Sequence, residues 1–175
     1  MEGNNTVANK PSVYLAGPIR GVEDYQWRKE FTERYGDLFH YLIPSDVVTT
    51  DWKKLREFRP AAYMTYRTDL DMIDRCDTVI MNLLAHTKDN YPAVGTLFEL
   101  GYARAKGKLI LMVAEDKLRS HPFIAFGADG VYGSFDEMDG FLRKYMQVLN
   151  GGCPIFDELK KPKYVYSDYD VRERS

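Results

Sequence analysis

The chain has 175 residues, of which 45% are hydrophobic and 29% are charged, a composition typical of one globular domain. Its 24 basic and 26 acidic residues give a formal net charge of -2, so no broad basic surface is expected for a nucleic acid polymer. The two cysteines, Cys76 and Cys153, belong to no CxxC pair or Cys/His cluster, which argues against a disulfide framework and a structural zinc site.

Neither a leader sequence nor a membrane segment is predicted. Residues 1–11 are polar and lack the apolar core of a signal peptide. The longest apolar stretch, residues 109–114, is too short to cross a bilayer. We therefore expect a cytoplasmic protein with no membrane partner.

Short apolar segments alternate along the chain with longer amphipathic ones, which is the pattern of an α/β protein. The clearest helix has Leu97, Leu100 and Ala103 on one face and Gly107 as a natural C-cap. In chain order, the predicted elements are a strand (13–16), a helix (25–35), a strand (41–43), a helix (61–75), a strand (78–84), a helix (95–106), a strand (109–113) and a helix (135–149).

Four strands that alternate with helices predict an open parallel sheet. A ligand binds such a sheet beyond the carboxyl ends of the strands. This rule singles out three segments as candidate ligand sites: residues 17–21, residues 82–95 and the loop that follows Val113.

The turn after the first strand has the sequence Gly17-Pro18-Ile19-Arg20-Gly21. Its glycines let the backbone approach a ligand closely, and its arginine is a candidate ligand for a phosphate or a carboxylate. The turn is neither a GxGxxG nor a Walker A sequence, so a tight turn with a solvated arginine explains it equally well.

Glu99 lies near the start of the helix that Gly95 opens, in a segment that begins at the carboxyl end of a predicted strand. An acidic residue in this position can simply complement the helix dipole. Glu99 stands between Phe98 and Leu100, however. A carboxylate held there is suited to act as a nucleophile or as a general acid or base at the floor of a pocket.

Four aspartates crowd the stretch before the third predicted strand: Asp69, Asp71, Asp74 and Asp77. Most acidic residues on a helix form a solvated face, and Asp77 is placed to cap or turn the backbone. No metal site is predicted, because the three histidines do not have the spacing of metal ligands.

Three motifs together resemble the nucleoside 2-deoxyribosyltransferases and the related 2'-deoxynucleoside 5'-phosphate N-hydrolases. They are VYLAGP at residues 13–18, the aspartate-rich stretch 69–77 before an apolar strand, and GTLFELGYA at residues 95–103. The resemblance covers roughly residues 13–149, and its third motif is quite specific. It implies a flavodoxin-like fold, a doubly wound parallel sheet flanked by helices.

The resemblance also implies roles for individual residues. Glu99 would be the catalytic nucleophile, Asp69 would handle the proton of the leaving base, and Tyr14 would orient the nucleophile. The turn after the first strand would line the sugar or phosphate side of the site. The candidate substrate-binding residues are Gly17, Pro18, Ile19, Arg20, Asn82, Asp89, Asn90 and Gly95.

The implied organisation is a catalytic domain over residues 12–150, preceded by a flexible N-terminus, residues 1–11. Residues 151–175 would form a C-terminal tail that contacts a neighbouring subunit in a homodimer or larger homo-oligomer. The partners would be small nucleosides or nucleotides and free nucleobases, and no metal or organic cofactor would be required.

Two departures from the family patterns leave the substrate open. Transferases typically have an aspartate six residues before the nucleophile, where this chain has Ala93. The monophosphate hydrolases tend to have phosphate-binding serines where this chain has Pro18, Ala93 and His121. Recognition of the base is then expected to fall to Asp89, Asn90 or Asn82.

Three functions are therefore weighed. The first is a transferase that exchanges bases on 2'-deoxynucleosides. The second is a hydrolase that releases the base from deoxynucleosides or their 5'-monophosphates. The third is a non-catalytic nucleotide sensor, for which Glu99 would be dispensable. The transferase hypothesis ranks first and the sensor last.

Overall fold

The computed structural model describes residues 10–18, 22–44, 59–84 and 94–149. Its strands are β1 (Ser12–Ala16), β2 (His40–Leu42), β3 (Thr78–Asn82), β4 (Leu109–Val113) and β5 (Gly130–Tyr132). Its helices are α1 (Val22–Tyr35), the 3-10 turn η1 (Gly36–Leu38), α3 (Arg59–Arg75), α4 (Val94–Ala105), α5 (Asp116–Arg119), α6 (Pro122–Ala125) and α7 (Phe135–Leu149). Within these residues, no helix is both long and apolar enough to cross a membrane.

The five strands form one sheet in the order β2-β1-β3-β4-β5, and every neighbouring pair is parallel. This is the flavodoxin-like order, so the predicted fold class is confirmed. The chain leaves β1 toward β2 on one side and returns to β3 on the other. The carboxyl ends of β1 and β3 therefore flank the point where the strand order reverses, which is where open α/β sheets bind ligands.

The sequence prediction of four strands was wrong by one, because it missed β5. This strand has three residues, and its only buried side chain is that of Val131. Glycines at positions 130 and 133 also hide any apolar run. Strand β5 forms by pairing with β4, from Leu111↔Gly130 to Val113↔Tyr132, so a tertiary contact rather than a local preference creates it.

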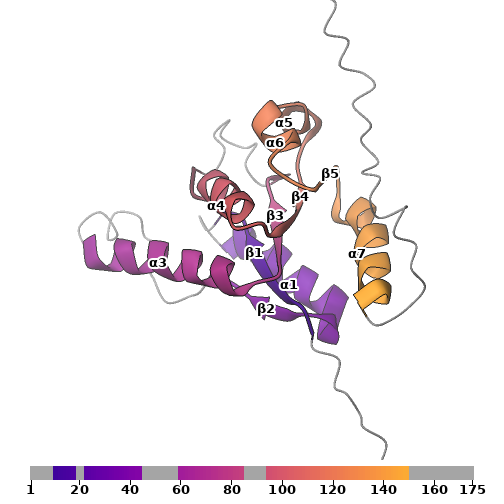
Figure 1. Ribbon diagram of the computed structural model, residues 1–175, viewed down its shortest axis with the longest axis horizontal. Helices are drawn as coiled ribbons and strands as arrows, with labels where there is room; N and C mark the ends of the chain where they lie inside the picture. The colour runs from indigo at the N-terminus through magenta and orange to yellow at the C-terminus, as the bar shows by residue number, and fades with distance from the viewer. Residues whose placement is uncertain (1–9, 19–21, 45–58, 85–93, 150–175) are drawn as a thin grey trace, which may run out of the picture.

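Alternating side chains of the strands form two cores. Val13 and Leu15 pack with α1 and α7 on one face of the sheet. Tyr14 and Ala16 point to the opposite face, where α3 and α4 pack. Figure 1 shows α7 and α4 on opposite sides of the strands, with α3 extending past the sheet. Position 14 therefore faces the helices that carry the predicted catalytic acids.

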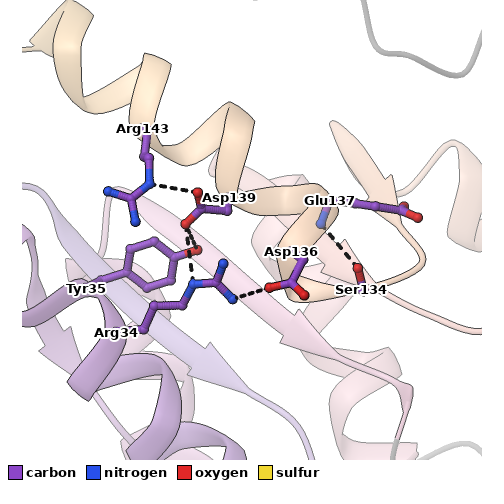
Figure 2. Close-up of polar contacts among 7 residues, drawn as sticks. All are labelled: Arg34, Tyr35, Ser134, Asp136, Glu137, Asp139 and Arg143. Carbon is purple, nitrogen blue, oxygen red and sulfur yellow. Dashed lines mark hydrogen bonds and ion pairs between the residues drawn. The ribbon is translucent and has the colours of Figure 1, made fainter.

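A polar network joins α1 to α7 on the first of these faces (Figure 2). Arg34 pairs with Asp136 at 2.6 Å and with Asp139 at 3.4 Å. Asp139 also accepts a hydrogen bond from the Tyr35 hydroxyl at 3.1 Å and one from Arg143 at 2.7 Å. These contacts fix the position of α1 relative to α7.

The end of α4 bears out the prediction that Gly107 is a C-cap. Gly107 has a φ of +68°, a left-handed conformation that glycine adopts at little cost. Its N–H donates to the Arg104 carbonyl at 3.1 Å, and the N–H of Lys108 donates to the Ala103 carbonyl at 3.1 Å. The turn directs the chain from α4 into β4.

Candidate active site

A tyrosine and a glutamate that are 85 residues apart in sequence meet at the centre of the molecule. The hydroxyl of Tyr14 donates a hydrogen bond of 2.9 Å to Oε1 of Glu99. Tyr14 is fully buried in β1, whereas Glu99 comes from the second turn of α4 and is half-buried. The buried strand therefore holds one oxygen of the Glu99 carboxylate in place.

Glu99 has a perturbed pKa. Burial raises the pKa of its carboxyl first, and the negative charge of Asp69 raises it further. The hydrogen bond from Tyr14 and the charge of Arg28 act in the opposite direction, and the resulting pKa is about 8. Burial also raises the pKa of Tyr14 well above its ordinary value, so the phenol remains a hydrogen-bond donor at neutral pH.

Asp69 brings a second carboxyl to this cluster from α3. It is half-buried, and burial raises its pKa to about 6, while Arg28 pulls that pKa down. Because Asp69 and Glu99 interact, the pair titrates as a unit. Taken together, it binds one proton between about pH 6 and about pH 8. Paired carboxyls with separated pKa values are suited to combine a nucleophile with an acid.

The other three aspartates of the acidic stretch have structural contacts. Asp71 and Asp74 form ion pairs at the surface, each at 2.9 Å. The carboxylate of Asp77 accepts hydrogen bonds from both the backbone N–H and the hydroxyl of Ser12, each at 2.7 Å. This contact anchors the beginning of β1, so Asp77 acts through a tertiary contact with Ser12 rather than through the local cap or turn that its position predicted.

The turn after β1 is tightly packed, and Gly17 is what permits this. A Cβ atom at Gly17 would lie 3.0 Å from the Trp27 ring and 3.3 Å from the carbonyl oxygen of Asn82. A side chain at this position would require the Trp27 ring or the Asn82 carbonyl to shift by a few tenths of an ångström. Gly17 and Pro18 are both buried, so this part of the predicted ligand-binding turn contributes backbone rather than side chains.

Arg28 is a functional candidate that the sequence analysis did not identify. The residue is only 2% exposed, and its guanidinium donates to the carbonyls of Leu15, Gly17 and Pro18 at 3.1, 2.9 and 3.1 Å. The sequence does contain an indication of this burial, because an arginine three residues before Phe31 falls on the buried stripe of the helix.

Of the remaining predicted site residues, two lie within the described part of the structure and four lie outside it. Asn82 is buried at the end of β3, where its Oδ1 accepts the backbone N–H of Leu84 at 3.0 Å and ends the strand two residues earlier than predicted. Gly95 is exposed in the first turn of α4. The candidates that lie outside the described residues are Ile19, Arg20, Asp89 and Asn90.

Metal-binding clusters are absent from the part of the chain that the structure describes. There, no group of three or more His, Cys, Asp or Glu side chains is placed to hold a metal ion. Cys76 is buried as a free thiol.

Comparison with known proteins identifies the family. The family model for nucleoside 2-deoxyribosyltransferase matches residues 13–150, which is most of the chain. This chain belongs to the nucleoside 2-deoxyribosyltransferase family. Comparison with curated proteins gives no match. The family assignment confirms the resemblance drawn from the three sequence motifs.

Among solved structures, a 2-deoxyribosyltransferase from Bacillus psychrosaccharolyticus is similar over 88% of this chain and 99% of its own, with 18% identity and a TM-score of 0.56. At this identity the likeness supports the fold. A conserved protein from Enterococcus faecalis (17% identity, TM-score 0.44) covers 65% of this chain and 69% of its own. A CMP N-glycosidase from Clostridium botulinum (18% identity, TM-score 0.42) covers 79% and 97% respectively.

Proposed function

We propose that this member of the family cleaves the N-glycosidic bond of 2'-deoxynucleosides and passes the sugar to another base. The observation that carries the proposal is the 2.9 Å hydrogen bond between Tyr14 and Glu99, beside a second carboxyl at Asp69. Two carboxyls around one reacting carbon are the usual equipment for glycoside cleavage through a covalent intermediate.

In the proposed reaction, the ionised carboxylate of Glu99 attacks C1' of the sugar while the bond from C1' to the base nitrogen breaks. Because the sugar lacks a 2'-hydroxyl, positive charge builds readily at C1' in the transition state, and the carboxylate stabilises it. The electron pair of the broken bond stays on the base, which takes a proton from Asp69 directly or through water.

The second half of the reaction reverses these steps. A new base attacks C1' of the deoxyribosyl-Glu99 ester, gives its proton to Asp69, and releases the Glu99 carboxylate. Two successive displacements at the same carbon retain its configuration. If water replaces the base as acceptor, the same residues perform hydrolysis, so the acceptor distinguishes a transferase from a hydrolase.

A product analysis tests this function. The purified protein is incubated with a panel of 2'-deoxynucleosides and their 5'-monophosphates, with and without a second free base, and the products are separated by chromatography. We expect base exchange without net loss of nucleoside. Release of free sugar at the same rate with or without a second base would establish a hydrolase instead. Absence of any turnover would leave only a sensor.

We predict that kcat/KM has a bell-shaped dependence on pH, with half-maximal points near 6 and near 8. Below the lower point both carboxyls are protonated, so no nucleophile is present. Between the two points the pair holds one proton; because the pKa of Glu99 is the higher, that proton lies mainly on Glu99, and the reactive form, with the proton on Asp69 and Glu99 ionised, is the minor one. Above the upper point both are ionised, so no acid remains for the leaving base. A rate profile from about pH 5 to about pH 9.5 measures both limbs. A flat profile across this range would contradict the carboxyl pair.

We also predict that unphosphorylated deoxynucleosides are at least as good substrates as their 5'-monophosphates. In the described part of the turn, Gly17 and Pro18 present carbonyls that Arg28 already binds. Arg20 is then the candidate phosphate ligand, and one charge-assisted contact contributes about ten- to a hundredfold in affinity. Comparing kcat/KM for a deoxynucleoside and its monophosphate measures the preference.

A preference for the 5'-monophosphate would contradict this prediction. A monophosphate preference above about a hundredfold that disappears in Arg20→Ala would place a full phosphate site in the turn. Arg143→Ala is the matched control, because this arginine pairs with Asp139 on α7. The control should leave the substrate preference unchanged.

A further inference from the structure

Arg28 belongs to α1, a helix on the opposite face of the sheet from the helices that carry Glu99 and Asp69. Its side chain nevertheless reaches the carboxyl end of β1. Burying a guanidinium is costly, so a buried arginine requires good geometry and several partners. The planes of two aromatic rings flank it: its Cζ lies 4.7 Å from the ring centre of Trp27 and 5.3 Å from that of Tyr25.

The hydrogen bonds of Arg28 converge on one short segment. Nε donates to the carbonyl of Leu15, Nη2 to that of Gly17, and Nη1 to that of Pro18. Three donors in a rigid fork thus fix three carbonyls within four residues. These carbonyls lie where β1 ends and the candidate ligand-binding turn begins, so the side chain determines the path of the backbone there.

The charge of Arg28 also reaches the catalytic carboxyls. It lowers the pKa of Glu99 and that of Asp69, and so favours their ionised forms. The groups that act on Glu99 come from three elements: Tyr14 on β1, Asp69 on α3 and Arg28 on α1. Of these, only Arg28 is a cation, and it opposes the burial that keeps the Glu99 carboxyl protonated.

We propose that Arg28 is a positioning residue of the active site, which shapes the turn after β1 and supplies a fixed positive charge to the catalytic carboxyls. The role in catalysis rests on the function proposed above. The geometry separates two contributions: the fork of donors fixes the backbone, and the charge sets the ionisation of the pair. One substitution that removes the fork and another that removes the charge therefore test the two contributions independently.

The test uses Arg28→Lys and Arg28→Gln, which both keep an N–H donor, although only lysine keeps the charge. Lysine lacks the planar fork, so Arg28→Lys should raise KM about tenfold or more while both limbs of the pH profile stay in place. In Arg28→Gln, both limbs should move to higher pH by roughly half a unit or more, because the charge that lowers both pKa values is gone.

Arg34→Gln is the matched control. Arg34 lies on the same helix but pairs with Asp136 and Asp139 of α7, on the face away from the catalytic acids (Figure 2). Its replacement should lower the unfolding temperature and leave KM and both limbs unchanged. This control distinguishes the loss of any arginine of α1 from the loss of Arg28.

Two results would overturn the proposal. In the first, the limbs of the pH profile of Arg28→Gln stay at their wild-type positions. In the second, the limbs of Arg28→Lys move as far as those of Arg28→Gln. If Arg28→Gln does not fold, a wild-type KM in Arg28→Lys overturns it. The titration of Glu99, followed by the ¹³C shift of its carboxyl, needs no turnover. A raised pKa in Arg28→Gln therefore supports the charge effect even if the wild-type protein proves inactive and the proposed function fails.

Discussion

Replacement of Glu99 by glutamine should reduce turnover of a 2'-deoxynucleoside by about a thousandfold or more, because an amide cannot form the covalent ester. Glutamine keeps the size of the side chain and an oxygen that can accept the Tyr14 hydrogen bond. The loss should therefore be in kcat rather than in the fold. Steady-state kinetics with a sensitive assay of free base measures the effect, and a variant with near-wild-type kcat would contradict the mechanism.

The same variant should be more stable than the wild type at alkaline pH. The pKa of Glu99 is about 8 in the folded protein against an ordinary value of 4.5, so the folded state retains a proton that the unfolded chain has released. Stability therefore falls as pH rises from about 4.5 to about 8, and Glu99→Gln removes this loss. Thermal unfolding at about pH 4 and about pH 8.5, on either side of this range, compares the two proteins.

Replacement of Asp69 by asparagine should reduce turnover by about a hundredfold or more for bases that need protonation to leave. Substrates with better leaving groups should lose much less, since their departure does not depend on a proton. The upper limb of the pH profile should disappear. The remaining limb should report the ionisation of Glu99 alone, with a pKa below its wild-type value of about 8, because the negative charge of Asp69 that raises this pKa is gone.

Asp71→Asn provides the matched control for Asp69. This residue lies two positions along α3 but is exposed and pairs with Arg75 at 2.9 Å. It should retain wild-type activity on every base. An equal loss for good and poor leaving groups in Asp69→Asn would show that Asp69 has a structural role and does not deliver the proton.

The layout of the sheet could be predicted from the sequence, because buried parallel strands leave a strong local signal. The apolar run after Asp77 and the run from Leu109 to Val113 became the central strands β3 and β4. The helix between them ends at Gly107 as its pattern predicts. Strand β5 escaped prediction because its three residues become a strand only through pairing with β4.

The candidate site was harder to predict, for a similar reason. No spacing rule joins Tyr14 to Glu99, and their pairing came from the family resemblance rather than from periodicity. The sequence analysis did not identify Arg28, although this residue falls on the buried stripe of its helix, and the carbonyls that it binds belong to the preceding strand and turn. Such a contact depends on how α1 packs against the sheet, which composition and periodicity do not specify.

The proposed mechanism requires a covalent bond between C1' of the sugar and Glu99, which mass spectrometry of the intact protein detects. The protein is mixed with a 2'-deoxynucleoside in the absence of an acceptor base, quenched rapidly in acid, and digested to map the modified peptide. We expect a mass increase of one deoxyribosyl group, located on Glu99 and absent from Glu99→Gln. A burst of free base equal to the enzyme concentration, with the protein unmodified throughout, would contradict it.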